Sequence, residues 1–420
     1  MIYIQSEKYL QTRAIQGPWR ISGCTEHGFS GAVVIPALAE SAHLFNTLCS
    51  LAANPPDLLA RFLVLVVVNH REDGLSGDKV DNYQTLIRLA SGDLELAQLR
   101  LAWVDAASPG VEMPAKAGGV GFARKIGLDL ALPRLDFTGQ SPLLVSLDAD
   151  TLVEPSYLPA LADHFRFSKR GGAVIPFSHR PGATPEEQEA IDRYELFLRS
   201  YVLGLSLAGS PYAFHSVGSA MACTVDAYIR MGGMNRRPAA EDFYFLQQLH
   251  RTAGVEQLRG TTVHPSARSS HRVPFGTGRS ISRTLLEDSA AIMFYQPKCF
   301  HILYAWLKAV SGNPGRNACS IVAEAASISP HLAGYLEIAG FTGIWEKLRK
   351  NHISSETLRS AFHSWFDGLR TMKLIHHLSA GPFPRCEPEE SLPPLLEWSG
   401  LEMVNGTTGQ LALLRRIQNG

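Results

Sequence analysis

The chain has 420 residues, and 45% of them are hydrophobic, which is ordinary for a protein that buries a large core. Its length exceeds the usual domain of about 100–200 residues, so we expect two domains, or one large domain with an appendage. Lysine plus arginine and aspartate plus glutamate each number 39. This balance argues against a nucleic-acid partner and against a disordered acidic tail.

The amino-terminal segment MIYIQSEKYLQTR lacks the long apolar core of a secretory signal. No stretch approaches the roughly 20 apolar residues of a membrane span. The cysteines form no C-x-x-C pair and no metal-type cluster: Cys24, Cys49, Cys223, Cys299, Cys319 and Cys386. We therefore expect free thiols in a reducing compartment and a cytoplasmic protein, with peripheral contact to the inner face of a membrane left open.

Strand and helix patterns alternate over residues 31–260. The expected strands are Ala32–Pro36, Phe62–Asn69, Leu99–Asp105, Leu143–Leu147, Ala173–Pro176 and Ser219–Thr224. The expected helices are Ala42–Ala53, Asp78–Ser91, Phe122–Leu130, Leu158–Phe167, Glu186–Leu207 and Asp226–Met231. Such alternation predicts an α/β fold with a mostly parallel, twisted sheet that is flanked by helices.

The pattern changes after a Gly/Ser/Arg-rich stretch at 265–280, which we interpret as a loop. Apolar residues then recur at helical spacing in Leu285–Met293, Ile302–Val310, Ile321–Ile328 and Leu358–Leu369. A Pro-rich linker, Pro382–Pro394, and a short element ending at Ile417 complete the chain. We therefore predict a catalytic domain over 1–280 and a helical C-terminal appendage with a Pro-rich tail over 281–420.

The segment LLVSLDADTLVEPSYL, residues 143–158, is the most informative in the chain. A buried strand leads into Asp148-Ala149-Asp150, and strict alternation in an extended segment would point both carboxylates the same way. Magnesium and manganese bind one or two carboxylates plus substrate phosphates, and open α/β sheets bind ligands at the carboxyl ends of their strands. The alternative is that both aspartates are solvated strand-end residues that help to cap the next helix.

Four further segments flank this motif. The first strand ends at Pro36 and is followed by Glu40, and the second ends in Asn69-His-Arg-Glu-Asp73-Gly. A glycine-rich basic turn, KAGGVGFARK, opens a helix at residues 116–125. Glycines allow close backbone approach, and a helix amino terminus with cations favours anions, so a diphosphate fits there. The last segment, GGMN, leads into Glu241-Asp242.

In this order the motifs resemble the inverting family-two glycosyltransferases of the GT-A fold, over roughly residues 30–280. The resemblance implies a soluble, non-processive transferase, because the chain lacks Q-x-x-R-W and a membrane span. The donor would be a nucleotide-diphosphate sugar, with Mn or Mg as cofactor. The implied donor-binding residues are Pro36, Glu40, Asn69, Asp73, Lys116, Gly121, Arg124 and Asp148, with Gly118 and Gly119 beside them.

The resemblance also assigns catalytic and metal-binding residues. Asp242 would be the general base that takes the proton of the acceptor hydroxyl, with Glu241 as the alternative. Asp148 and Asp150 would hold the metal, and related enzymes supply a late-loop histidine, here His271. Arginines offer paired donors to phosphate, so Arg272 and Arg279 would close over the donor as part of a lid, 264–280. The alternative is that this stretch is a surface loop that only joins the catalytic domain to the helical appendage.

Three other functions remain open at this stage. A sugar-phosphate nucleotidyltransferase would need the same sheet and metal, but would carry its basic glycine-rich signature after the first strand, where this chain has Pro36-Ala-Leu-Ala-Glu40. Some retaining GT-A enzymes share the D-x-D and late histidine. A degenerate domain would bind a nucleotide or partner without catalysis. The acceptor could be lipid-linked, a glycan or a small molecule.

Overall fold

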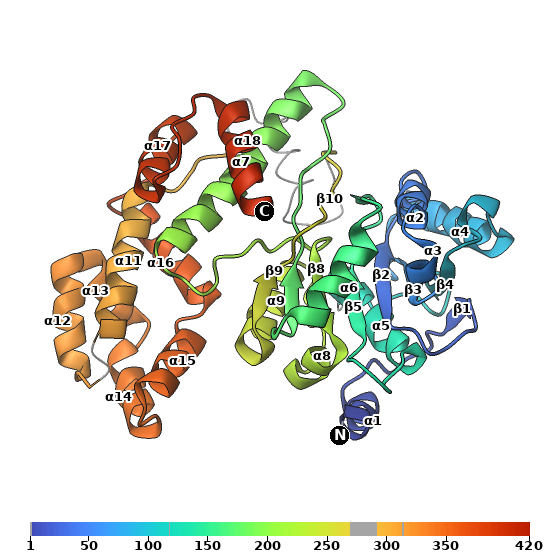
Figure 1. Cartoon of the computed structure of the whole chain (residues 1–420), viewed down its shortest axis with the longest axis horizontal. Coiled ribbons are helices and arrows are strands. Elements are labelled where there is room, and N and C mark those ends of the chain that lie inside the picture. Colours follow the sequence, from blue (N-terminus) through green and yellow to red (C-terminus); the bar gives the residue numbers. More distant parts are fainter. Residues whose placement is uncertain (1, 117, 269–291, 313–314) are drawn as a thin grey trace. The chain divides into compact units, whose positions relative to one another are not determined.

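The computed structural model describes residues 2–116, 118–268, 292–312 and 315–420, and they form two compact units. The sheet unit takes in residues Met1–Ile191, Ser216–Arg283 and Gln418–Gly420, and the helical unit takes in Asp192–His215 and Thr284–Ile417 (Figure 1). The predicted division at residue 280 stays a prediction. The helical unit also contains residues 192–215, which we had assigned to the catalytic domain.

One eight-stranded sheet forms the centre of the sheet unit, with strand order β1-β4-β3-β2-β5-β8-β7-β9. Its strands are β1 (Ile21–Gly23), β2 (Gly31–Ala37), β3 (Phe62–Asn69), β4 (Arg100–Ala106), β5 (Leu143–Ser146), β7 (Gly172–Val174), β8 (Met221–Thr224) and β9 (Val255–Gln257). A separate two-stranded sheet pairs β6 (Leu152–Val153) with β10 (Val263–His264). All six predicted strands are present, whereas β1, β6, β9 and β10 are too short to show a pattern.

Strands β4, β3, β2 and β5 are parallel and adjacent, and the antiparallel β8 lies against β5. Every residue of β2 and β3 is buried, as expected for strands whose two faces are both covered. The predicted class, an α/β fold with a mostly parallel sheet flanked by helices, is therefore confirmed. Because these four strands run the same way, their carboxyl ends meet at one edge of the sheet.

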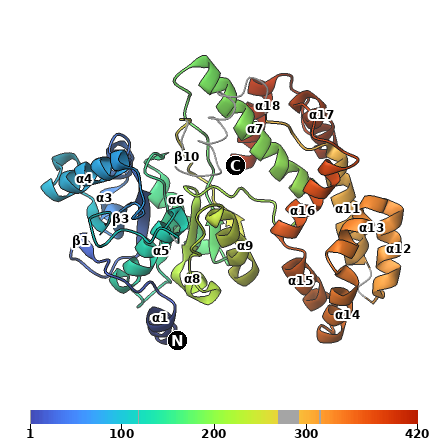
Figure 2. The same ribbon diagram turned by 180° about the vertical axis from the view of Figure 1, so that it is seen from behind.

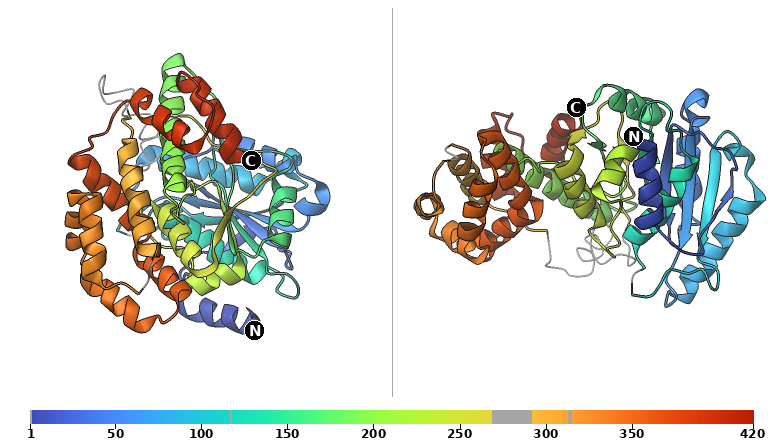
Figure 3. Two further views of the ribbon diagram at one scale, coloured as in Figure 1. Left: turned by 60° about the vertical axis from the view of Figure 1, so that its left-hand side comes forward. Right: turned by 90° about the horizontal axis from the view of Figure 1, so that it is seen from below.

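Helices cover both faces of this sheet (Figure 3). The helices of the sheet unit include α1 (Ile2–Thr12), α2 (Leu44–Ala52), α3 (Pro56–Leu59), α4 (Ser76–Ser91), α5 (Val120–Ala131), α6 (Tyr157–Phe167), α8 (Val225–Met231) and α9 (Glu241–Ala253), with short 3₁₀ turns at Leu94–Leu96 and Leu132–Arg134. Helix α5 packs on β2 and β3, where Gly127 lies against Val34 and Val67. A side chain at Gly127 would overlap both valines, so the glycine permits this close approach.

The helical unit contains helices only among its described residues (Figure 2). They are part of α7 (Pro185–Leu207), then α11 (Pro297–Gly312), α12 (Ala318–Ile328), α13 (Pro330–Ile338), α14 (Phe341–Asn351), α15 (Ser355–Trp365), α16 (Gly368–Ala380), α17 (Pro388–Ser399) and α18 (Thr407–Asn419). Aromatic rings fill its core, with Trp306 edge-on to Phe341 and Phe362 at centroid distances of 5.1 and 5.8 Å. The predicted helical appendage is thus present, although residues 285–291 of its first expected helix lie outside the described residues.

The predicted Pro-rich linker over 382–394 is wrong from residue 388 onward, where α17 begins. Pro388 occupies the first turn, where a missing N–H leaves no hydrogen bond unmade. Pro393 and Pro394 lie inside the helix, where proline is ordinarily unfavourable. The buried side chains of Leu392, Leu395 and Leu396 compensate by packing into the core of the helical unit.

Two further expectations concern the cysteines and the membrane. All six cysteines are free thiols, as predicted. Within the described ranges, no helix is both long enough and apolar enough to cross a bilayer.

A buried carboxylate, Asp129 of α5, holds the amino-terminal segment to the sheet unit. Its oxygens accept hydrogen bonds from the hydroxyls of Tyr9 and Tyr228 at 2.8 and 2.7 Å, and from the backbone N–H of Ile15 at 2.8 Å. Lys125 Nζ lies 2.7 Å from the same carboxylate, and both side chains are at most 4% exposed. Helix α1 was not expected from its sequence, and this long-range network accounts for its placement.

We predict that Asp129→Asn lowers the free energy of unfolding by about 3–5 kcal/mol, because it leaves the Lys125 ammonium buried without its counter-charge. Urea denaturation measures the change. Asp93→Asn is the matched control, since Asp93 pairs with the half-exposed Arg88 at the surface and its loss should change stability by less than about 1 kcal/mol. Equal effects of the two variants would contradict this account of Asp129.

Candidate active site

The carboxyl ends of β2, β3 and β5 bring most of the predicted site residues to one edge of the sheet. Glu40 follows β2, Asn69 ends β3, and Asp148 follows β5. The amino terminus of α9, with Glu241 and Asp242, packs against the amino terminus of α5. Residues from five separate elements therefore meet where open α/β sheets bind their ligands.

The two aspartates of the D-x-D motif do not lie on an extended strand. Strand β5 ends at Ser146, and residues 149–150 form a turn in which the N–H of Thr151 donates to the carbonyl of Asp148 at 3.1 Å. The predicted alternation of an extended segment is therefore wrong, because the chain must turn here to enter the short strand β6. Each carboxylate instead meets its own arginine.

Arg124 joins Asp148 to Glu241. Its guanidinium donates to Asp148 Oδ1 through Nη2 and to Glu241 Oε1 through Nη1. The Arg124 side chain is only 2% exposed, whereas that of Asp148 is 36% exposed. Arg124 had been predicted to contact the donor phosphates. The structure pairs its charge with two protein carboxylates. A contact with phosphate stays a prediction.

The glycines of the basic turn make this arrangement possible. A β-carbon at Gly121 would overlap the Arg237 carbonyl and the Glu241 side chain, and one at Gly119 would overlap Pro238. A β-carbon at Gly118 would meet the Arg71 side chain. The glycines thus let α5 approach α9 and its neighbours. Whether Gly121 also borders a ligand stays a prediction.

Burial is the largest influence on the pKa values of the acids at this edge. It raises the pKa of Asp148, although Arg124 partly offsets the effect. For Arg124 itself, burial opposes the charged form, but Asp148 and Glu241 outweigh it and raise the pKa. Burial and then the neighbouring Glu241 raise the pKa of Asp242 from its ordinary 3.8 to about 7. Asp242 is therefore partly protonated near neutral pH.

Two alanines adopt a left-handed backbone conformation, each directly before a predicted site acid. Ala39 has φ 52° and precedes Glu40, and Ala240 has φ 56° and precedes Glu241. Among the described residues, no other non-glycine residue has a positive φ. Such strain costs about 1–3 kcal/mol and clusters at functional sites, where the surrounding structure enforces it.

The loop that carries Glu40 is held by two residues of α4. The side-chain oxygen of Asn82 accepts the Ala39 N–H at 2.9 Å, and Asp81 accepts the N–H and hydroxyl of Ser41 at 3.0 and 2.5 Å. The Asn82 amide also donates to the Asn69 carbonyl at 2.9 Å. One buried amide therefore ties the loop after β2 to the end of β3.

Glu40 and Asp150 share a second arginine. The guanidinium of Arg268 donates to both oxygens of Glu40 at 2.5 and 2.6 Å and to Asp150 Oδ2 at 3.0 and 2.8 Å. Arg180 donates to the Asp150 backbone carbonyl at 3.0 Å. Arg268 lies in the stretch 264–280 that was predicted to be a phosphate-closing lid, and its pairing with Glu40 and Asp150 was not expected. Arg180 stands in none of the motifs.

The remaining predicted donor residues have mixed environments. The Asn69 amide is buried and donates to the carbonyls of Ala37 and Val67. Asp73 is half-exposed and pairs with Arg71 at 2.9 Å, and Lys116 is exposed. Pro36 is buried within β2. The predicted ligands His271, Arg272 and Arg279, and most of the predicted lid, lie outside the described residues.

The charges of the edge favour a cation. Five carboxylates gather there against the guanidinium groups of Arg124 and Arg268, and the carboxylates are Glu40, Asp148, Asp150, Glu241 and Asp242. Arg124 contacts Asp148 through Oδ1 and Arg268 contacts Asp150 through Oδ2, so the hydrogen bonds of each carboxylate with its arginine use one of its two oxygens. No group of three or more His, Cys, Asp or Glu side chains in this part of the chain could hold a metal by itself. Two carboxylate oxygens still suit Mg²⁺ or Mn²⁺, which take their other ligands from phosphates and water.

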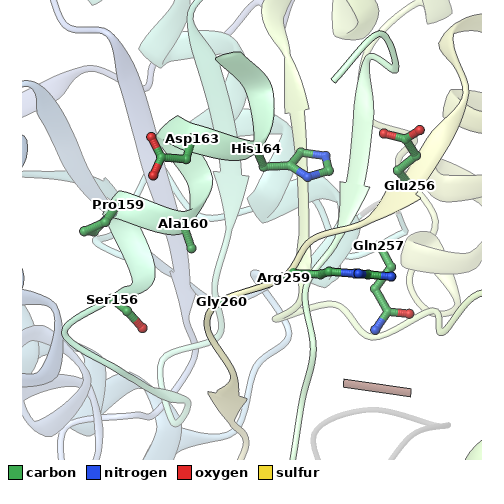
Figure 4. A pocket seen from close by; sticks show the side chains of 9 residues that line it. All are labelled: Ser156, Pro159, Ala160, Asp163, His164, Glu256, Gln257, Arg259 and Gly260. Atoms are coloured by element: carbon green, nitrogen blue, oxygen red, sulfur yellow. The ribbon is translucent and has the colours of Figure 1, made fainter. Parts of the chain in front are cut away.

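A pocket of about 440 Å³ lies elsewhere in the sheet unit, between the start of α6 and the segment after β9 (Figure 4). Its lining residues are Ser156, Pro159, Ala160, Asp163, His164, Glu256, Gln257, Arg259 and Gly260. None of the predicted site residues lines it. The edge of the sheet with its acidic cluster, rather than this pocket, is therefore the candidate active site.

Comparison with known proteins found solved structures but no related sequences. No family model and no curated protein sequence matches the chain. A fragment of Staphylococcus aureus TarS in complex with UDP-GlcNAc is 14% identical, with 92% of this chain and 90% of that chain covered and a TM-score of 0.39. The mannosyltransferase PcManGT of Pyrobaculum calidifontis, in complex with GDP-Man and Mn²⁺, is 15% identical over 99% and 93%, with a TM-score of 0.38.

Both are glycosyltransferases. At such TM-scores, what these proteins bind gives no information about the residues of this chain. The assignment of the site therefore depends on the acidic cluster and the sheet topology.

We predict that Ala240→Gly does not lower the free energy of unfolding and raises it by as much as about 1 kcal/mol, because glycine adopts a positive φ without a steric penalty. Ala160→Gly is the matched control, since Ala160 lies inside α6 and glycine there should cost about 1 kcal/mol. Chemical denaturation of both variants gives the comparison. A loss at residue 240 equal to that at 160 would show that Ala240 is not strained.

Proposed function

We propose that the protein is a metal-dependent glycosyltransferase that moves one sugar, of the hexosyl type, from a nucleotide-diphosphate sugar to an acceptor hydroxyl. The observation that carries this proposal is the acidic cluster at the carboxyl ends of β2 and β5. It combines a D-x-D pair, in which each carboxylate contacts its arginine through one oxygen, with a carboxyl whose pKa is about 7. The first suits a metal and diphosphate, and the second suits an acid–base step.

The proposed site residues fall into two groups, one that binds the donor and one that acts on the acceptor. Asp148 and Asp150 would hold the divalent ion, which when bound would stabilise the charge of the departing diphosphate. Glu40 and the end of β3 would border the nucleoside. The Asn82 side chain would keep these two segments next to each other through its hydrogen bonds to Ala39 and Asn69. The protein would thus bind the donor with its nucleoside towards β2 and β3.

Asp242 would accept the acceptor's proton while that hydroxyl attacks the anomeric carbon, giving inversion. A base works best when its pKa lies near the working pH, and a pKa of about 7 meets that condition. Glu241 is less suited, because Arg124 already neutralises its carboxylate. A product that retains the donor's anomeric configuration would replace inversion by retention and leave the donor site unchanged.

We predict that UDP or GDP, or one of their sugar derivatives, raises the melting temperature only when Mn²⁺ or Mg²⁺ is present. The metal and diphosphate complete each other's ligand sets, so each should bind weakly alone. A thermal-shift panel with and without metal measures this. Asp150→Asn should remove most of the shift, whereas Asp226→Asn, in an exposed ion pair on α8, should retain it. No shift with any nucleotide would refute the proposed donor.

We predict that kcat/KM rises with pH through about 7 and then levels off, because the base must be deprotonated. Asp242→Asn should lose that rise and reduce the rate by about 10²–10⁴-fold, with nucleotide affinity nearly unchanged. The free energy of unfolding should instead fall as the pH rises. The native state favours protonated Asp242, so the contribution of this carboxyl to stability is present below about pH 4 and is lost as the pH rises through 7. Wild-type turnover by Asp242→Asn would refute the assignment.

A further inference from the structure

Arg268 lies between two carboxylates, Glu40 and Asp150, which follow the adjacent parallel strands β2 and β5. Its guanidinium makes four close contacts, two with Glu40 and two with Asp150. The side chains of Glu40, Asp150 and Arg268 are 12%, 22% and 25% exposed. A planar guanidinium with paired donors suits this bridging geometry, in which one cation neutralises two carboxylates.

The two arginines of the edge differ in how firmly they are held. Arg124 lies on α5, is 2% exposed and pairs with a glutamate that is 6% exposed. Removing a partner from such a buried pair costs several kcal/mol. Arg268 follows the two-residue strand β10, outside any helix or strand, and a quarter of its side chain is exposed. Solvent can reach its contacts more readily, so Arg268 is the less deeply buried of the two arginines.

We propose that Arg268 is an exchangeable counter-ion that competes with the divalent cation for the Glu40–Asp150 end of the site. While Arg268 is paired with Asp150, its charge weakens metal binding to that carboxylate. A nucleoside diphosphate offers phosphate oxygens, which attract the guanidinium away from the carboxylates and expose Asp150 to the metal. The inference rests on the proposed function, because it concerns the regulation of that same donor site.

Cooperative binding follows from this competition. Metal binding displaces the arginine from Asp150, and diphosphate binding stabilises the displaced arginine, so each ligand offsets a cost that the other would meet alone. By thermodynamic linkage the two effects are equal, and such couplings typically amount to roughly 5- to 150-fold in affinity. Arg268 would thus ensure that the metal binds tightly only together with the donor.

The test measures Mn²⁺ binding to the full chain without nucleotide, by titration calorimetry. Arg268→Gln should bind Mn²⁺ at least about fivefold more tightly than wild type, because the competing charge is gone. Arg268→Lys keeps the charge but loses the paired donors, and should give an intermediate affinity. Arg230→Gln is the matched control, since Arg230 forms an exposed ion pair on α8, and it should bind Mn²⁺ as wild type does.

A second titration repeats the measurement with saturating UDP or GDP. Nucleotide should tighten Mn²⁺ binding by wild type, and the ratio of the two dissociation constants should be smaller in Arg268→Gln. Equal Mn²⁺ affinities of wild type and Arg268→Gln without nucleotide, at equal melting temperatures, would overturn the proposal. If Arg268→Gln is unstable, Arg268→Lys decides, and an affinity equal to that of wild type overturns it.

The two proposals fail in different ways. If neither UDP nor GDP binds the wild-type protein or changes its Mn²⁺ affinity, the proposed glycosyl transfer from these donors is refuted. The Mn²⁺ titration without nucleotide still decides whether Arg268 competes with a cation. Conversely, nucleotide binding that depends on Mn²⁺ equally in wild type and Arg268→Gln would support the donor and overturn the counter-ion.

Discussion

The buried guanidinium of Arg124 is the constraint on which the candidate site depends. A charge removed from water must be paired, and Arg124 finds its counter-charges on two segments that are far apart in the chain, Asp148 after β5 and Glu241 at the start of α9. Gly121 and Gly218 leave the space that this packing needs, because a β-carbon at Gly218 would overlap the guanidinium. The proposed donor and acceptor sides are therefore held together by one side chain.

This pairing also distinguishes two adjacent acids. Arg124 neutralises Glu241, whereas Asp242 receives no such partner from it and lies next to the charge of Glu241. The exposed area of Asp242 is intermediate, yet enough protein surrounds it for burial to be the main cause of its raised pKa. Burial raises the pKa of both carboxyls and Arg124 opposes the rise at both, but only Glu241 forms an ion pair with the guanidinium.

The loops of the edge are held in conformations that they would not adopt alone. Ala39 and Ala240 are strained, and the contacts of Asn82, Asp81 and Arg124 with the adjacent segments supply the stabilisation that maintains them. These bracing residues belong to regular helices, α4 and α5, which keep the loops in place. Much of the precision of the site therefore comes from Asp81 and Asn82, which are not among the predicted site residues, and from Arg124, which is paired with Asp148 and Glu241.

The sequence by itself determined the elements whose signals are local. Apolar runs such as 62–68 and 143–147 can be satisfied only in a buried strand, and a carboxylate that follows such a run must lie at the edge of the sheet. The class of the fold, the six principal strands and the position of Asp148 were predictable for this reason. The order of the motifs similarly placed Glu241 and Asp242 near the same edge.

Only the tertiary structure decided which charged groups meet. Arg124 and Glu241 are 117 residues apart, and Arg268 and Glu40 are 228 apart, so no local spacing connects them. The turn at 149–150, the two-residue strands β6 and β10, and helix α17 with its internal prolines likewise depend on distant partners. Long-range burial and ion pairing outweigh local propensity at these places, and the same contacts determine the charge of each acid in the site.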